Sequence, residues 1–287
     1  MTSVREAAVA GQFYPGNTGK LDATVRRLLD EASQNAVTGD DAPVPKAIIA
    51  PHAGYIYSGA VAAAAYARLA PAAATIKRVV LLGPCHRVPI RGLALSGADA
   101  FRTPLGDVPV DKDGATKAAG LPGVEVFDAT HELEHSLEVH LPFLQVVLDD
   151  FSVVPLVVGE AGTAEVADVI EALWGGPETV IVVSSDLSHY LDYDSARKID
   201  SATSRAIERL DPSAVSRDGA CGRFPIGGLL EIAKRRGMTV TTLDLRNSGD
   251  TAGCKDRVVG YGSWMFQEAQ SGVSRDRDDI KSPPNAW

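Results

Sequence analysis

The sequence has few cysteines, few aromatic residues and no excess of positive charge. Its 287 residues include three cysteines, Cys85, Cys221 and Cys254, and no CxxC pair. Isolated thiols in odd number predict no disulfide framework, as expected in a reducing compartment. The net charge of -9 argues against nucleic acid or an anionic membrane as a partner. Small molecules and proteins remain as candidate ligands.

Targeting segments and several common active-site motifs are also missing. The first residues lack the basic and apolar regions of a signal peptide, and the longest apolar stretches are strand-length or broken by proline. We therefore expect a cytoplasmic protein. No GxSxG, P-loop or GxGxxG motif occurs, so the usual signatures of serine hydrolases, nucleotide triphosphatases and dinucleotide-binding proteins are absent.

The sequence does contain a clear alternation of strand-like and helix-like segments. Such alternation predicts an α/β fold, in which a central, mostly parallel sheet is flanked by helices. We expect one domain over residues 1–269, followed by a disordered tail over 270–287. Helical periodicity or composition predicts helices over 20–32, 58–70 (with Ser58 as N-cap), 163–173, 195–210 and from 224 onward.

Other segments have weaker signals. Residues 100–110 are expected to form a hairpin or loop excursion, and residues 124–127 a short strand. The leucine spacing after His131 predicts a helix that is broken or kinked near Pro142. Residues 238–245 and 258–266 alternate like antiparallel edge strands.

Three apolar runs end in turn residues followed by histidine. They are KAIIAPHAG (46–54), RVVLLGPCH (78–86) and TVIVVSSDLSH (179–189). Ligands of parallel sheets bind outside the carboxyl ends of the strands, so these runs predict a site at one sheet edge. The polar side chains delivered there are His52, His86, Asp186 and His189.

Two imidazoles with one anionic side chain form a typical site for a redox metal with open positions for substrate. His52 and His86 are the candidate imidazoles. The spacing leaves the third ligand open among Asp186, Glu138 and Cys221. Because Cys221 lies just before a predicted helix, its thiol is expected to tend toward thiolate.

A competing signal is His131-Glu132-Leu133-Glu134-His135, a literal match to the zinc-protease pattern HExxH. On a helix this spacing would place two imidazoles on one face, beside a general base. No further HxxGxxH ligand run follows, and the surrounding chain resembles a doubly wound sheet. The alternative, non-catalytic interpretation is that the segment forms a solvated helix face.

An ordered series of segments resembles the Memo family, called AmmeMemoRadiSam system protein B in microbes. The match spans about Arg5 to Phe266, and its segments are REAAVAGQFYP, APHAGYIYSG, GPCHRVP, FRTPLGDVPVD, EHSLEVHLPFL, VVPLVVG, SSDLSHY and CGRFPIGGLL. The family is similar in fold to the catalytic subunit of class III extradiol ring-cleaving dioxygenases. The resemblance thus implies an α/β domain with a non-haem iron site.

Residue by residue, the resemblance implies metal ligands at His52, His86 and Cys221, and catalytic residues at His189 and Asp186. It also implies that HExxH is accidental, because the family block EHSLEVH begins at Glu134. We further expect three residues to surround the ligands and two to line the pocket. The first three are His135, Glu138 and His140; the other two are Tyr55 and Arg223.

Two departures from related patterns bear on the chemistry. Family members often have GPSHH where this chain has GPCHR, so Cys85 and Arg87 replace serine and histidine. Ring-cleaving dioxygenases use a carboxylate as third ligand, whereas the matching residue here is Cys221; thiolate is softer and favours copper, zinc or a differently tuned iron.

The resulting hypothesis is a metal-dependent redox or dioxygenase-like protein that acts on a small molecule with Fe(II), or with copper or zinc. The alternative is a non-catalytic module that binds a peptide or other ligand in a vestigial enzymatic pocket. The family name also implies association with a radical SAM protein and an AMMECR-type protein.

Overall fold

The computed structural model describes residues 3–34 and 43–268, and four adjacent parallel strands form its centre. In spatial order these are β2 (Ala47–Ala50), β9 (Thr179–Ser184), β3 (Arg78–Pro84) and β8 (Ser152–Val158). Because they are parallel and adjacent, their carboxyl ends meet at one edge. The predicted order of apolar strand followed by polar turn is confirmed for each histidine-bearing run.

The other strands of the nine-stranded sheet make it mixed rather than parallel throughout. β12 (Val258–Gln267) runs antiparallel to β2 and pairs with β11 (Thr239–Asn247) and β10 (His189–Leu191). On the opposite side, β4 (Leu93–Leu95) is antiparallel to β8, and β7 (Val124–Val126) follows it. The antiparallel prediction is confirmed, but β12 is not an edge strand, since β2 and β11 flank it.

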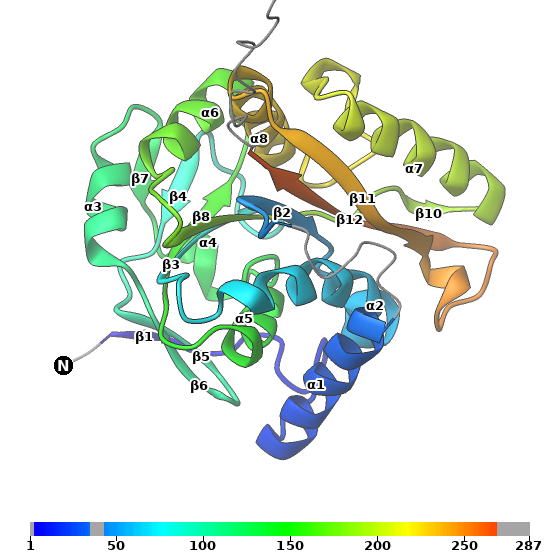
Figure 1. Cartoon of the computed structure of the whole chain (residues 1–287), viewed down its shortest axis with the longest axis horizontal. Helices are drawn as coiled ribbons and strands as arrows, with labels where there is room; N and C mark the ends of the chain where they lie inside the picture. Colours follow the sequence, from blue (N-terminus) through cyan, green and yellow to red (C-terminus); the bar gives the residue numbers. More distant parts are fainter. Residues whose placement is uncertain (1–2, 35–42, 269–287) are drawn as a thin grey trace, which may run out of the picture.

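A smaller sheet contains the N-terminal strand. β1 (Val4–Arg5) pairs with β5 (Ala100–Thr103), which forms a hairpin with β6 (Gly106–Pro109). The hairpin expected over residues 100–110 is therefore present. Figure 1 shows this sheet below the end of the main sheet, beside α5.

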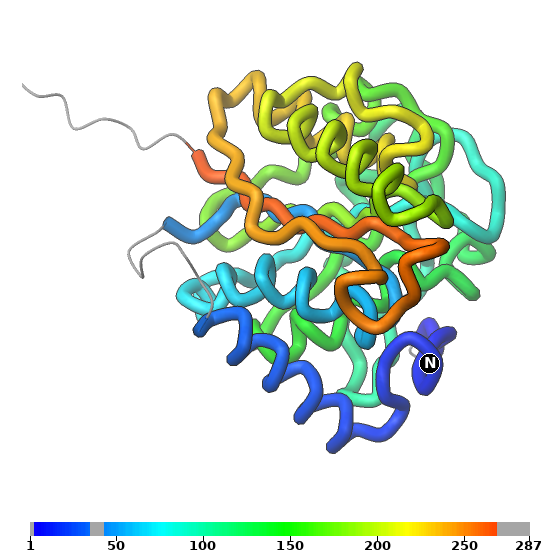
Figure 2. Tube along the Cα trace, turned by 90° about the vertical axis from the view of Figure 1, so that its right-hand side faces the viewer, coloured from blue at the N-terminus to red at the C-terminus, as the bar shows by residue number. Residues whose placement is uncertain are grey.

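Helices cover both faces of the main sheet (Figures 1 and 2). One layer contains α1 (Thr18–Gln34), α2 (Tyr55–Tyr66) and α5 (Leu141–Val147). The other contains α3 (Lys112–Ala119), α6 (Thr163–Ala172), α7 (Tyr193–Glu208) and α8 (Arg223–Arg235). Shorter pieces are α4 (Ala129–Glu132) and the 3-10 turns η1 (Ala67–Ala72), η2 (Glu138–His140), η3 (Pro212–Ala214) and η4 (Ser248–Asp250).

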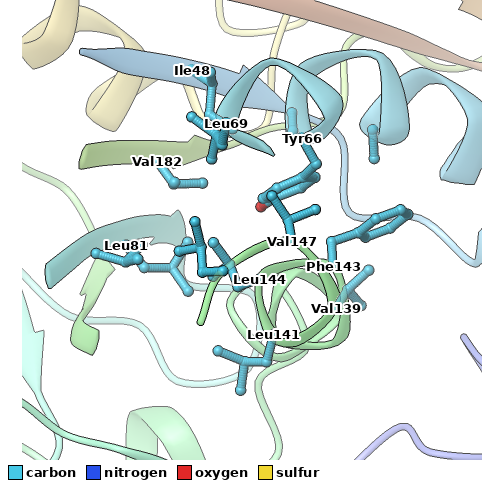
Figure 3. Packing of buried hydrophobic residues seen from close by; sticks show 14 of the residues in the cluster. Ile48, Tyr66, Leu69, Leu81, Val139, Leu141, Phe143, Leu144, Val147 and Val182 are labelled. Atoms are coloured by element: carbon cyan, nitrogen blue, oxygen red, sulfur yellow. The ribbon is translucent and has the colours of Figure 1, made fainter. Parts of the chain in front are cut away.

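The interior positions of the central strands are apolar because both of their faces are buried. Polar residues occur only at strand ends, at Arg78, Ser152, Thr179 and Ser184. Ile48, Leu81 and Val182 point into the core beneath α2 and α5 (Figure 3), and their chain neighbours point into the core beneath α6 and α8. Side chains of a strand alternate between faces, so two helical layers require an uninterrupted apolar run. Each fully buried aliphatic side chain contributes about 1.5–3 kcal/mol.

Two helix boundaries differ from prediction. The helix expected from Ser58 begins at Tyr55, and the Ser58 hydroxyl donates to the carbonyl oxygen of Ala53 at 2.9 Å from inside the first turn. Pro142 is the second residue of α5 and does not kink a longer helix, because proline fits the first turn, where its missing N–H costs nothing.

Two further expectations have different outcomes. The tail predicted over 270–287 lies outside the described residues, and a single domain over 1–269 stays a prediction. Within the described ranges, none of the helices has both the length and the apolar character needed to cross a membrane.

Candidate metal centre

The site lies where β2, β9 and β3 end side by side. His52 follows the last residue of β2 by two positions, and His86 follows the last residue of β3 by two positions. β9 lies between them and leads into Asp186. A fourth segment, the loop between α4 and η2, adds His135.

Three histidine rings converge at this edge. Ring centroids are 5.2 Å apart for His52 and His86, 5.3 Å for His52 and His135, and 4.7 Å for His86 and His135. One potential ligand atom from each lies within 4.8 Å of the others. The structure thus brings together the two predicted imidazoles and also His135, which the sequence placed only in their surroundings.

The position of the proton on His52 follows from its hydrogen bonds. The hydroxyl of Ser184 donates to the carbonyl oxygen of Ser136 at 2.7 Å, so its oxygen accepts from His52 Nδ1 at 2.6 Å. Nδ1 then carries the proton, and Nε2 keeps a free lone pair. Burial, followed by the nearby His86 and His135 rings, lowers the pKa of His52 well below its ordinary value. The ring is neutral, as a metal ligand requires.

His86 is fixed in the same tautomer by Glu134. Its Nδ1 lies 2.9 Å from Glu134 Oε1, and its backbone N–H donates to Oε2 at 2.6 Å. Burial opposes ionisation of Glu134, but the bonds from His86 and the Ser136 N–H lower its pKa to about 2. An ionised carboxylate only accepts, so Nδ1 of His86 carries the proton and Nε2 is available for a metal.

His135 contributes an unpaired buried nitrogen. Its Nδ1 has no hydrogen-bond partner, although Glu134 Oε1 lies 3.3 Å away. Burial lowers the pKa of His135 to about 4, so this ring is also neutral near pH 7. Phe13 packs on it, with ring centroids 4.8 Å apart. An orphaned buried nitrogen beside two fixed imidazoles fits a bound cation.

Cys221 approaches the site from the loop before α8. Its Sγ lies 3.5 Å from His52 Nε2 and accepts the N–H of Asp186 at 3.3 Å. This close approach requires Gly222, where a Cβ would lie 2.5 Å from the carbonyl oxygen of Ser184. The predicted third ligand therefore faces the free nitrogen of the predicted first ligand.

The expectation that Cys221 tends toward thiolate is wrong for the metal-free protein. Burial and the neighbouring Asp186 raise the pKa of the thiol to about 12, and this outweighs the start of α8. Burial likewise raises the pKa of Asp186 to about 7, despite a 2.8 Å hydrogen bond from the His52 N–H to its Oδ1. A metal ion would change this balance, because a coordinating thiol loses its proton.

The other predicted catalytic and pocket residues lie outside the three-histidine cluster. His189 is exposed at the start of β10, yet desolvation by the surrounding protein lowers its pKa. Arg223 is half-buried and stacks on Phe224, 4.2 Å from the ring centroid. Tyr55 lies in the core and donates to the carbonyl oxygen of Val139 at 2.8 Å, so the structure places it behind the site rather than on an open wall.

Glu138 and His140 are both fully buried behind the histidine cluster. Glu138 pairs with Arg5 and also accepts from Tyr14 at 2.5 Å, which occupies its oxygens away from the cluster. It was one of three candidates for the third ligand, and these contacts give it a supporting position instead. His140 Nδ1 bonds Tyr66 Oη at 2.8 Å, and burial lowers its pKa to about 3.

The HExxH match does not form a two-histidine face. α4 ends at Glu132, so one helix does not carry both imidazoles. His131 donates from Nε2 to the carbonyl oxygen of Ala94 at 3.0 Å, packs against Phe101, and lies outside the cluster that His135 joins. The zinc-protease interpretation therefore has no structural support, and the solvated-face interpretation is wrong for His131, which is buried.

Comparison with known proteins places this geometry in a family. The family model described as Memo-like protein matches residues 5–265, a range that includes every residue of the site. A MEMO1 family protein from Aquifex aeolicus is 36% identical over 275 residues, which cover 92% of this chain and 99% of that protein. The chain belongs to the Memo family. A MEMO1 family protein from Methanosarcina mazei is 36% identical over 279 residues, covering 92% and 99% of the two chains. Protein MEMO1 from Danio rerio is 33% identical over 293 residues, covering 90% and 95%.

Several residues of the Memo site were not predicted from the sequence. Ser184 and Glu134 set the tautomers of the two histidines, yet neither was a candidate residue. Both lie inside segments that carried the family resemblance, since Glu134 opens EHSLEVH and Ser184 opens SSDLSHY. Arg5 lies at the start of the first such segment. The available signal was position within these segments, with no chemistry attached to it.

Proposed function

We propose that this Memo protein holds one redox-active transition-metal ion, Fe(II) or copper, with His52, His86 and Cys221. The observation that carries the proposal is the fixed Nε2 lone pair on each of two adjacent imidazoles, one of them facing a thiol. Outer groups that fix a histidine tautomer are typical of metal sites. A bound ion would supply Lewis acidity and one-electron chemistry at the strand ends.

The spacing of the donors supports Cys221 as the third ligand. Bonds of about 2.3 Å to sulfur and 2.0–2.1 Å to nitrogen place two tetrahedral ligands about 3.5 Å apart. Cys221 Sγ and His52 Nε2 are separated by 3.5 Å, so the pair needs little movement to share an ion. Neutral His135 lies beside them, available as a further donor or as a proton acceptor.

The remaining polar residues would handle substrate and protons. His189 is exposed and neutral near pH 7, so it can accept a proton from a bound small molecule. Asp186 is held by the N–H of His52, with its Oδ2 3.9 Å from His52 Nε2, and would orient the ligand set. A thiolate in place of a carboxylate makes the donor set softer than that of the ring-cleaving dioxygenases and favours copper or a differently tuned iron.

Elemental analysis tests the proposal directly. Protein purified without oxygen or added metal should contain close to one iron or copper ion per chain. His52→Ala and Cys221→Ser should lose it, whereas Cys254→Ser, at an exposed cysteine, should retain it. Circular dichroism would verify that each variant is folded. Equal metal content in all four proteins would refute the assignment.

Two other outcomes would change the ligand assignment or the proposed function. Loss of metal in His135→Ala with retention in Cys221→Ser would make the three histidines the ligand set. Protein without any metal that binds a peptide or small molecule, in competition with changes at His52, would favour the binding module. The expected association with a radical SAM protein and an AMMECR-type protein stays a prediction.

A further inference from the structure

We propose that the N-terminal segment Arg5–Tyr14 is a structural part of the metal centre, with Arg5 and Tyr14 as positioning residues. This inference rests on the proposed function for its metal readout, but its structural core concerns the histidine rings themselves. The segment holds residues 131–138, from which Glu134, His135 and Ser136 reach the cluster.

Arg5 binds the backbone of residues 131–138 at two points. Its Nε donates to the carbonyl oxygen of His131 at 2.9 Å, and its Nη2 to that of Glu134 at 2.5 Å. The third nitrogen, Nη1, pairs with the carboxylate of Glu138. A planar guanidinium holds three acceptors in a fixed fork, which lysine cannot reproduce. Arg5 is only 8% exposed, so solvent does not replace these bonds.

Glu138, in turn, connects residues 131–138 to several residues of the N-terminal segment. Besides Arg5, its carboxylate accepts from Ala8 N–H at 2.8 Å, Val9 N–H at 3.0 Å and Tyr14 Oη at 2.5 Å. Four donors from the N-terminal segment therefore converge on one fully buried carboxylate. A buried charge is retained when it is paired and its remaining lone pairs are satisfied. The segment and residues 131–138 thus depend on each other.

Residues 131–138, held in this way, set the orientation of all three histidine rings. Glu134 fixes His86, the carbonyl oxygen of Ser136 fixes His52 through Ser184, and His135 belongs to the segment itself. Phe13 adds a direct contact by packing on the ring of His135. The loop lies so close over β3 that a Cβ at Gly83 would be 2.9 Å from Ser136 Oγ. Displacement of the N-terminal segment would consequently misalign the cluster.

The test compares Tyr14→Phe, Arg5→Lys and Arg5→Gln with the control Arg26→Gln. Arg26 is an exposed arginine on α1, paired with Asp22 and outside Arg5–Tyr14, so its loss leaves the contacts of Arg5 and Glu138 intact. Long-range proton–nitrogen NMR of metal-free protein labelled on histidine reports the tautomer of each ring. We expect Tyr14→Phe and Arg5→Gln to mix the tautomers of His52 and His86, and Arg5→Lys to show a smaller change.

Metal affinity supplies the second readout. Loss of an outer group that positions a ligand typically weakens metal binding about 10- to 100-fold. Competition with a chelator should show this loss for Tyr14→Phe and Arg5→Gln, partial recovery for Arg5→Lys, and no change for Arg26→Gln. If Arg5→Gln does not fold, Tyr14→Phe decides the question, since it removes a single hydroxyl.

The outcomes separate this inference from the proposed function. Unchanged tautomers and unchanged metal affinity in folded Tyr14→Phe and Arg5→Gln would overturn it. If wild-type protein binds no metal but its histidine tautomers change in the variants, the metal assignment fails and the positioning role stands.

Discussion

Ser184 offers the sharpest test of how the histidine cluster is built. Its hydroxyl accepts from His52 Nδ1 at 2.6 Å and donates to the carbonyl oxygen of Ser136 at 2.7 Å, with all three residues buried. Ser184→Ala removes both bonds and leaves a buried donor and a buried acceptor unpaired. Each such orphan costs about 1–3 kcal/mol. We therefore expect the free energy of unfolding to fall by about 2–6 kcal/mol.

The same change should release the proton of His52 from Nδ1. Once either nitrogen can carry the proton, part of the population has no lone pair on Nε2, and metal binding should weaken about 10- to 100-fold. Urea unfolding of the metal-free protein measures the stability change, and chelator competition measures the affinity.

Ser263→Ala is the matched control. Ser263 is also a fully buried serine in the main sheet, on β12, but its hydroxyl has no hydrogen-bond partner. Its removal should leave stability unchanged or raise it slightly, because an unsatisfied buried hydroxyl is itself unfavourable. If the two variants behave alike in both assays, the tautomer argument is refuted.

Two further predictions concern backbone packing and pH. Gly222→Ala should destabilise the fold by about 1–3 kcal/mol and weaken metal binding, because its Cβ would lie 2.5 Å from the carbonyl oxygen of Ser184; thermal unfolding and metal titration would measure this. Burial lowers the pKa of His131 to about 4, below its ordinary value near 6.5, so the unfolded chain binds the extra proton more readily. The contribution of His131 to stability should therefore fall by up to about 3 kcal/mol as pH drops from 6.5 to 4. His131→Gln should reduce the slope of stability against pH, measured by urea unfolding, over that window, to which His52, His135 and His140 also contribute. An unchanged slope in that variant would contradict the assignment.

The central sheet was predictable because burial on both faces leaves a simple signature. Ile48 and Ile49 point into opposite cores, so β2 had to be apolar throughout, and the same holds for the interior positions of β3 and β9. The position of His52 and His86 at one edge follows from parallel strand direction alone. These parts required no side-chain detail.

The supporting contacts were not predictable, because they join residues far apart in the sequence through single atoms. Arg5 and Glu138 are separated by 133 positions, and Ser184 and Ser136 by 48. Such a sequence separation does not distinguish a pair of polar residues in contact from any other pair of polar residues. Cys221 shows the same limit, since its predicted thiolate character followed from the nearby helix start, while burial beside Asp186 decides its pKa in the fold.

The HExxH segment shows why a correct residue can come with an incorrect motif. On a continuous helix, residues four apart share a face, which is the physical content of the pattern. Here the backbone leaves the helix after Glu132, so His131 turns toward Ala94 while His135 turns toward His52 and His86. The segment does contribute to the candidate metal centre, but through Glu134, His135 and Ser136, whose positions depend on Arg5. For this reason, a change at the N-terminus should affect the histidine cluster more than a change at His131.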